Sequence, residues 1–160
     1  MENLNLTTNI LVYTFDEGSE TAKKLIEKAK TATQSAYAPY SGFRVGAAVL
    51  LSNGQIIKGS NQENAAYPSG LCAERVALFT ANAEYPDTKV EAIAIAAFHD
   101  GDYTDTPCCP CGSCRQTMLE VENRYGQAIK VIMYGKDRIY EVESAKALLP
   151  LSFDKESLSE

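Results

Sequence analysis

VEAIAIAAF, residues 90–98, is a nearly continuous apolar run of the kind that forms a strand covered on both faces. A helical pattern follows from about Cys111 to Tyr125, and AIKVIMY, residues 128–134, is a second apolar run. A strand, a helix and a strand in this order predict two parallel strands joined by a right-handed crossover. This unit places the chain among the α/β proteins.

The other predicted elements complete a single sheet. A helix is expected over residues 19–36, where apolar side chains recur at helical spacing behind Ser19 as N-cap. Residues 43–51 and 56–60 flank an Asn-Gly hairpin turn. A second helix over 71–83, a short strand over 138–142 and a last helical turn ending at Pro150 follow. We predict a three-layer αβα fold with one mixed five-stranded sheet, and a binding site where helix N-termini converge beyond the strand ends.

Length and composition limit the possible functions. At 160 residues the chain suits one domain rather than two. The net charge of −6 disfavours a nucleic-acid partner, because such partners are held by Lys and Arg that neutralise phosphates. No apolar stretch approaches the roughly 20 residues of a membrane span, and the N-terminus lacks the basic segment of a signal peptide. We expect a cytoplasmic protein with a small substrate of little or no charge, and no membrane partner.

TPCCPCGSCRQ, residues 106–116, holds four of the five cysteines of the chain. Thiols are kept reduced in the cytoplasm, so the cluster favours a metal site or catalysis over disulfides. Cys111 and Cys114 form a C-x-x-C pair at a predicted helix start, and Cys72 lies at another helix start. Zinc with three protein ligands keeps a fourth position open for water, which is the arrangement of a catalytic site.

A second C-x-x-C pair, Cys108 with Cys111, is also possible. Pro110 suits the entry to a helix, which favours Cys111 with Cys114 and leaves Cys108 and Cys109 on the approaching loop as free thiols. A structural zinc site with four thiolates, one of them from Cys108 or Cys109, remains an alternative.

Two charged residues follow Cys72. Residues two apart on a helix point to different sides, so Glu74 is expected to stand beside the metal rather than to ligate it with Cys72. Three thiolates on a dication leave excess negative charge, and Arg75 is a candidate donor that would offset it. The partial positive charge of the helix N-termini lowers the pKa of the thiols there.

C-x-E followed by P-C-x-x-C is the signature of zinc nucleoside and nucleobase deaminases. YAPYSGFRVGAAV, NQENAAYPSGLCAER, PCGSCRQ and LLPLSF, in that order, closely resemble the small homotetrameric cytidine deaminases. The resemblance covers about residues 21 to 153. We therefore expect an N-terminal extension over residues 1–18, which adds a strand or a contact between subunits, and a single cytidine deaminase-like domain over 19–160. Cys108 and Cys109 depart from the family pattern.

The resemblance implies roles for individual residues. One zinc ion per subunit would be held by Cys72, Cys111 and Cys114, with Glu74 as the proton shuttle. The implied substrate contacts come from Phe43 on the pyrimidine, Asn61 and Glu63 on the ribose 3′-hydroxyl, the backbone of Ala73 on the base edge, Tyr67 over the site, and Phe153 of a neighbouring subunit. The implied reaction is hydrolytic deamination of cytidine and deoxycytidine to uridine and deoxyuridine plus ammonia, in pyrimidine nucleoside salvage by a homotetramer.

Other substrates would keep the same chemistry. Free cytosine, nucleoside antibiotics of the blasticidin type, and bases within polynucleotides are the alternatives. The amide and carboxylate of NQEN, residues 61–64, suit a hydroxyl and favour a free nucleoside. A zinc-stabilised assembly module without activity is the alternative of a different class, and it would leave Glu74, Asn61 and Glu63 unexplained.

Overall fold

The computed structural model describes residues 1–158 of the chain. The helices and strands, in chain order, are β1 (Leu11–Tyr13), α1 (Glu20–Ala32), β2 (Arg44–Leu51), β3 (Ile56–Ser60), α2 (Ala73–Glu84), β4 (Val90–His99), β5 (Asp102–Tyr103), α3 (Gly112–Tyr125), β6 (Lys130–Tyr134) and β7 (Ile139–Val142). Short 3₁₀ turns lie between them, at Phe15–Glu17, Thr33–Ser35, Tyr67–Ser69, Ala145–Leu148 and Lys155–Leu158.

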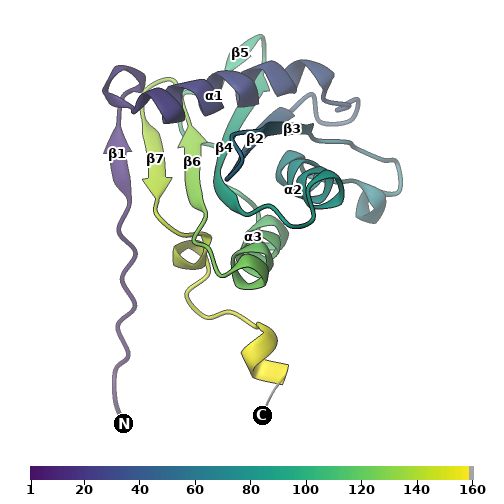
Figure 1. Cartoon of the computed structure of the whole chain (residues 1–160). Coiled ribbons are helices and arrows are strands. Elements are labelled where there is room, and N and C mark those ends of the chain that lie inside the picture. The colour runs from purple at the N-terminus through teal and green to yellow at the C-terminus, as the bar shows by residue number, and fades with distance from the viewer. Residues whose placement is uncertain (159–160) are drawn as a thin grey trace.

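One mixed sheet forms the middle layer, in the order β1-β7-β6-β4-β2-β3, with β5 paired to the end of β4. The predicted strand-helix-strand unit is confirmed, because β4 and β6 are parallel and α3 connects them. The helix α1 covers one face of the sheet, and α2 and α3 cover the other (Figure 1). Each face carries its own buried apolar cluster, which confirms the three-layer αβα architecture.

The prediction of five strands was wrong, because the sheet has seven strands within residues 1–158. β1 and β5 are three and two residues long, and neither shows the alternation that identifies a strand from sequence alone. Both are defined by partners far along the chain or across a turn: β1 pairs with β7, and β5 folds back on β4. The first helix also ends earlier than predicted, at Ala32, and a 3₁₀ turn replaces its last residues.

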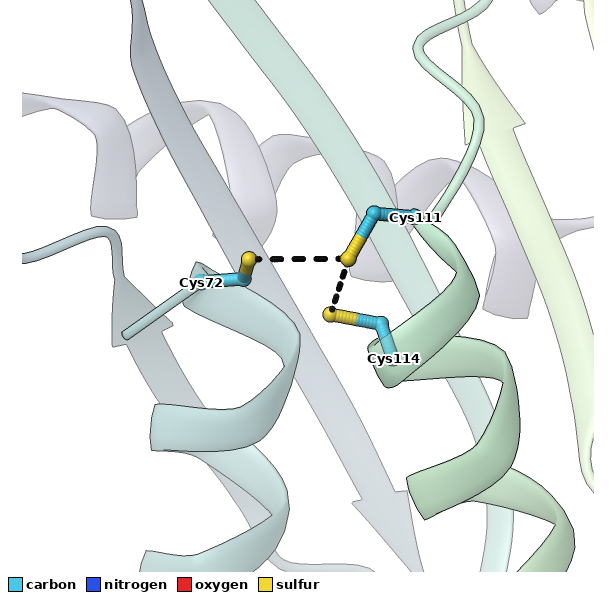
Figure 2. Close-up of side chains that lie close together, drawn as sticks. All are labelled: Cys72, Cys111 and Cys114. Carbon is cyan, nitrogen blue, oxygen red and sulfur yellow. Dashed lines mark hydrogen bonds between the residues drawn. The ribbon is translucent and has the colours of Figure 1, made fainter. Parts of the chain in front are cut away.

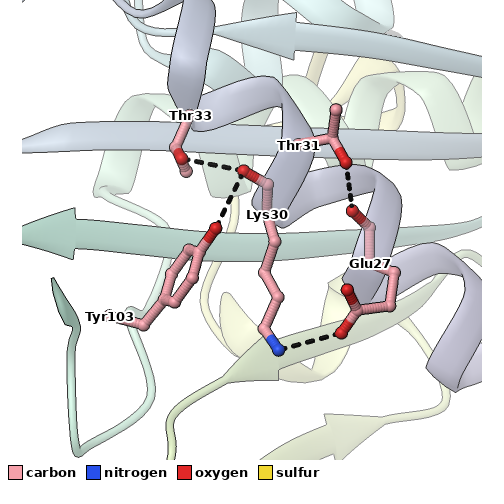
Figure 3. A network of polar contacts seen from close by, with 5 residues as sticks. All are labelled: Glu27, Lys30, Thr31, Thr33 and Tyr103. Atoms are coloured by element: carbon pink, nitrogen blue, oxygen red, sulfur yellow. Dashed lines mark hydrogen bonds and ion pairs between the residues drawn. The ribbon is translucent and has the colours of Figure 1, made fainter.

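The N-terminal extension supplies β1, and side-chain contacts add to the pairing of β1 with β7 in fastening it to the body. The Tyr13 hydroxyl donates to the buried carboxylate of Glu141 at 2.5 Å. Lys30 of α1 places its Nζ 5.1 Å from the ring centre of Phe15 and 4.4 Å from that of Tyr134. Tyr103 also contacts Lys30, because its hydroxyl donates to the Lys30 carbonyl (Figure 3). This segment therefore adds a strand, one of its two expected roles.

Glycines let the helices approach the sheet closely. A Cβ added at Gly59 of β3 would lie 2.4 Å from the backbone nitrogen of Ala77 in α2. A Cβ added at Gly46 of β2 would lie 2.1 Å from the carbonyl oxygen of Ala29 in α1. The close contact of β3 with α2 fixes where α2 begins relative to the sheet, and therefore also the position of Cys72.

Candidate functional site

Three cysteine sulfurs converge at the N-termini of α2 and α3. Cys72 is the N-cap of α2, Cys111 is the N-cap of α3, and Cys114 lies in the first turn of α3. The Sγ of Cys111 is 3.8 Å from that of Cys72 and 3.5 Å from that of Cys114 (Figure 2). All three sulfurs lie within 4.8 Å of one another. The two helix starts thus converge as the sequence predicted.

The spacing of these sulfurs fits tetrahedral zinc. A zinc–sulfur bond of about 2.3 Å and tetrahedral angles put two sulfurs about 3.8 Å apart. The separations of 3.8 and 3.5 Å are close to this value, so small side-chain adjustments would complete the geometry around one ion. Within residues 1–158, the cluster of possible metal ligands consists of these three thiols and excludes Cys108 and Cys109. The choice of Cys111 with Cys114 as the C-x-x-C pair is therefore supported, and three protein ligands leave an open position.

Charged and polar neighbours stabilise a thiolate at Cys72. Hydrogen bonds from Cys114, the Arg75 guanidinium and Cys111 lower the pKa of Cys72, against the opposing effect of burial. The pKa of Cys114 is raised, chiefly because its thiol is the proton donor to Cys72. The Nη2 of Arg75 lies 3.9 Å from the Cys72 sulfur, where the sequence predicted a cation.

Glu74 lies next to the sulfurs and is shielded from solvent, with 4% of its surface exposed. Burial raises the pKa of its carboxyl, and the negative charge of Cys72 raises it further. Glu74 is absent from the group of possible metal ligands but lines the same pocket as Cys72 and Cys111. A buried carboxyl with a raised pKa at the wall of a pocket can take up and return a proton.

A pocket of about 560 Å³ opens beside the sulfurs. We call its lining residues at the starts of α2 and α3 the floor: Cys72, Glu74, Arg75 and Cys111. We call its lining residues in the loop after β3, which include Asn61 and Glu63, the far wall. The lining residues outside the floor are Tyr40, Ser41, Val45, Asn61, Gln62, Glu63, Asn64, Tyr67, Gly70, Leu71, Cys108 and Cys109. The volume is in the range of small-molecule sites.

The predicted substrate residues fall into two groups. Asn61, Glu63 and Tyr67 line the pocket. Ala73 is fully buried beneath it at the start of α2, and Phe43 lies outside the lining, with its ring 5.5 Å from that of His99. Phe153 is 63% exposed and also lies outside the lining of its own chain's pocket.

Several pocket residues received no role from the sequence. Tyr40 and Ser41 belong to the quoted YAPYSGF stretch, but their reach into the pocket depends on the turn between α1 and β2. Cys108 and Cys109, predicted as bystanders to the metal, nevertheless form part of the pocket wall. Burial raises the pKa of Cys108 to about 12, so this thiol stays protonated.

The loop before α3 is fixed from two sides. Arg115 donates through Nε to the Pro110 carbonyl at 2.9 Å and through Nη1 to the Leu148 carbonyl at 3.2 Å. The backbone of residues 104–108 runs along residues 134–137, with Lys136 N donating to the Thr104 carbonyl at 3.0 Å. The turn that carries Cys111 is therefore held independently of any metal.

Comparison with known proteins agrees with this geometry. Residues 19–128 match the model of the cytidine and deoxycytidylate deaminase zinc-binding region. The chain is 42% identical over 137 residues to a cytidine deaminase of Sporosarcina psychrophila, covering 86% of this chain and 94% of the relative. The chain belongs to the cytidine deaminase family. It is therefore an enzyme of this family, as the sequence predicted, and not an inactive assembly module.

Other members of the family extend the agreement. A probable cytidine deaminase of Dictyostelium discoideum is 39% identical over 140 residues, which cover 87% of this chain and 88% of the relative. The crystal structure of cytidine deaminase from Burkholderia pseudomallei superposes with a TM-score of 0.70 at 39% identity, covering 82% of this chain and 98% of that one. The predicted fold class is thus confirmed.

Proposed function

We propose that this chain catalyses the zinc-dependent hydrolytic deamination of cytidine and deoxycytidine to uridine and deoxyuridine, with release of ammonia, in pyrimidine nucleoside salvage. The observation that carries the proposal is the meeting of three groups in one pocket. Two of the three clustered thiols and the buried Glu74 belong to its floor, and Asn61 and Glu63 stand on its far wall. This arrangement supports attack on one end of a small molecule that is held by hydroxyl groups at its other end.

Cys72, Cys111 and Cys114 would hold one zinc ion per subunit. When bound, zinc supplies Lewis-acid activation of a water molecule in its open position. The N-termini of α2 and α3 and the guanidinium of Arg75 face the thiolates and offset their negative charge. Arg75 thus keeps the site from becoming too electron-rich for catalysis.

Glu74 moves the protons of the reaction. It takes a proton from water as the oxygen adds to C4 of cytosine, and passes this proton to N3. It then takes the proton of the new hydroxyl group and delivers it to the amino group, which leaves as ammonia. C4 becomes a carbonyl carbon and N3 keeps its hydrogen, as uridine requires. The raised pKa of the buried Glu74 carboxyl supports both directions of transfer.

The far wall of the pocket favours a nucleoside over a nucleotide. Asn61 and Glu63 would bind the ribose 3′-hydroxyl, since an amide and a carboxylate both suit a hydroxyl group. Of the described residues that line the pocket, Arg75 is the only cationic one, and its guanidinium already faces Cys72. A 5′-phosphate would therefore meet carboxylates without a compensating cation.

The remaining contacts complete the pocket around the base. The backbone N–H of Ala73, at the start of α2, would contact the base edge, and Tyr67 would cover the opening. Phe43 would reach the pyrimidine from the edge of β2, and the exposed Phe153 would enter the pocket of a neighbouring subunit in a homotetramer. The exposure of Phe153 in the isolated chain supports a role outside its own subunit.

The proposed location is the cytoplasm. The five cysteines are free, as expected where thiols are kept reduced. In residues 1–158 no helix has the length and apolar character needed to cross a membrane. The acidic net charge of −6 supports a small-molecule substrate rather than a nucleic acid.

The decisive experiment compares wild type with Glu74→Gln. Zinc content is measured by elemental analysis and cytidine loss by ultraviolet absorbance. Glu74→Gln should retain zinc and lose at least about 10²-fold in kcat, the lower end of general acid–base contributions. Undiminished turnover would remove Glu74 from the mechanism, and failure of wild type to deaminate cytidine would overturn the proposed function.

Two further measurements separate the alternatives. Cytidine and deoxycytidine should be better substrates than CMP, free cytosine or an oligonucleotide, and a clear preference for any of the last three would contradict the roles of Asn61 and Glu63. Phe153→Ala should weaken activity of the assembled enzyme, as measured alongside the mass in solution. A fully active monomer would refute the contribution of a neighbouring subunit.

A further inference from the structure

The carboxylate of Glu63 is held by the turn that connects α1 to β2. Its Oε2 accepts from the backbone N–H of Tyr40 at 2.9 Å and from that of Ser41 at 3.3 Å. Its Oε1 accepts a short hydrogen bond from the hydroxyl of Ser41. The hydrogen bonds from Ser41 and Tyr40 lower the pKa of Glu63, so the group is a carboxylate at neutral pH. A side chain on the pocket wall is thus fixed by three donors from two neighbouring residues.

The Ser41 hydroxyl joins this carboxylate to the next strand. While it donates to Glu63, its oxygen accepts from the backbone N–H of Phe43 at 3.0 Å. A hydroxyl that accepts from the N–H two residues later closes a tight turn. Gly42, at the centre of this turn, has a φ of +67°, a left-handed conformation that side chains disfavour. Ser41 therefore links the Glu63 carboxylate to the backbone of Phe43, the residue before β2.

The side chain of Asn61 is fixed at the same turn. Its Oδ1 accepts from Val45 N at 2.8 Å, and its Nδ2 donates to the Phe43 carbonyl at 2.9 Å. Backbone hydrogen bonds between Gln62 and Leu71, at 2.9 and 3.0 Å, connect this segment to the residue before Cys72. The two proposed hydroxyl-binding side chains thus have defined positions relative to the metal ligands before any substrate arrives.

We propose that Ser41 is a positioning residue for the sugar: its hydroxyl holds the Glu63 carboxylate in the orientation that accepts a hydrogen bond from the 3′-hydroxyl of the nucleoside. The inference rests on the proposed function and extends it to a residue that would not touch the substrate. Without the Ser41 hydroxyl, Oε1 of Glu63 loses its donor, and the carboxylate is held through Oε2 alone and can pivot about that oxygen. Fixing the Glu63 side chain during binding then costs conformational entropy, and the affinity for the sugar falls.

The test combines a substitution in the enzyme with the removal of one hydroxyl group from the substrate. Ser41→Ala is compared with wild type on cytidine and on 3′-deoxycytidine, which lacks only the 3′-hydroxyl. With cytidine, kcat/KM should fall about tenfold, mainly through KM, the effect expected on losing one hydrogen bond to a charged group. With 3′-deoxycytidine the two enzymes should differ by less than about twofold. Ser41→Thr, which keeps a hydroxyl, should restore most of the loss.

Matched controls keep the outcome unambiguous. Ser52→Ala removes a hydroxyl from an exposed turn residue outside the pocket and should leave both substrates unaffected. Zinc content and melting temperature are measured for every variant. Equal losses on both substrates would overturn the positioning role and indicate a general structural one, and so would no loss on either. Absence of cytidine turnover by wild type would instead reject the proposed function, so the two failures are distinguishable.

Discussion

Glu122 is a buried carboxylate whose removal should destabilise the fold while leaving the three thiols in place. It lies in the last part of α3, with 7% of its surface exposed. Its Oε1 accepts from Ile129 N and Ala145 N, both at 2.7 Å, and its Oε2 accepts from Lys146 N at 3.2 Å. The Ser144 hydroxyl donates to both oxygens, at 2.9 and 3.0 Å. One side chain thus fastens α3 to the segment before β6 and to the turn after β7.

The magnitude follows from the donors that would be left behind. In Glu122→Ala, the N–H groups of Ile129 and Ala145 lose their acceptor at buried positions. Each unsatisfied buried donor costs about 1–3 kcal/mol, so the free energy of unfolding should fall by about 3–5 kcal/mol. For a domain of this size this corresponds to a melting temperature lower by about 10 °C. Glu122→Gln keeps one oxygen but turns an NH₂ group toward Lys146 N, so its loss should be intermediate.

Urea unfolding followed by circular dichroism measures the effect. Glu120→Ala is the matched control, because Glu120 is an exposed glutamate on the same helix and should change the free energy of unfolding by less than about 0.5 kcal/mol. A loss below 1 kcal/mol in Glu122→Ala would refute the reasoning. It would mean that water or a rearranged turn satisfies the donors.

Three further outcomes are expected. Gly135→Ala should lower the free energy of unfolding by about 1–3 kcal/mol and should lower zinc content, because its Cβ would lie 2.5 Å from the carbonyl carbon of Thr106 in the loop leading to α3. Gly112→Ala, at an open position, is the control, and equal behaviour of the two variants would contradict the prediction. Removal of zinc by a chelator should lower the melting temperature by about 5–10 °C, and zinc should restore it; an unchanged value after verified removal would show that the thiols are not coupled to folding. Deleting residues 1–18 should lower the free energy of unfolding by about 2 kcal/mol or more, because Glu141 loses its hydrogen bond from the Tyr13 hydroxyl. A truncated chain as stable as wild type in urea would show that β1 is dispensable.

The sequence predicted the cluster of three thiols because each thiol can be recognised from its own neighbours in the chain. A thiol at a helix start is recognisable from neighbouring letters, and Cys72, Cys111 and Cys114 each stand at such a start. Pro110 was enough to choose between the two C-x-x-C pairs. The roles of Asn61 and Glu63 came from the family resemblance, and nothing in their immediate neighbours indicates what holds them.

Only the tertiary structure revealed the residues whose role is to hold other side chains or segments in place. Ser41 and Glu63 are separated by 22 positions, and Glu122 reaches Ala145 across 23. No periodicity links such pairs, because their contact depends on how two loops are brought together by the sheet. β1 and β5 were missed for the same reason, since strands of three and two residues are defined by their partners rather than by their own letters.

By itself, the sequence determined the α/β class, the parallel unit around β4 and the placement of three thiols at helix starts, because apolar periodicity and helix-start chemistry are local properties of the chain. The tertiary structure decided what surrounds those thiols: the buried environment of Glu74, the cation of Arg75 beside Cys72, and the clamp of Ser41 on Glu63. Burial, hydrogen bonding and charge depend on which distant segments meet, and only packing fixes that.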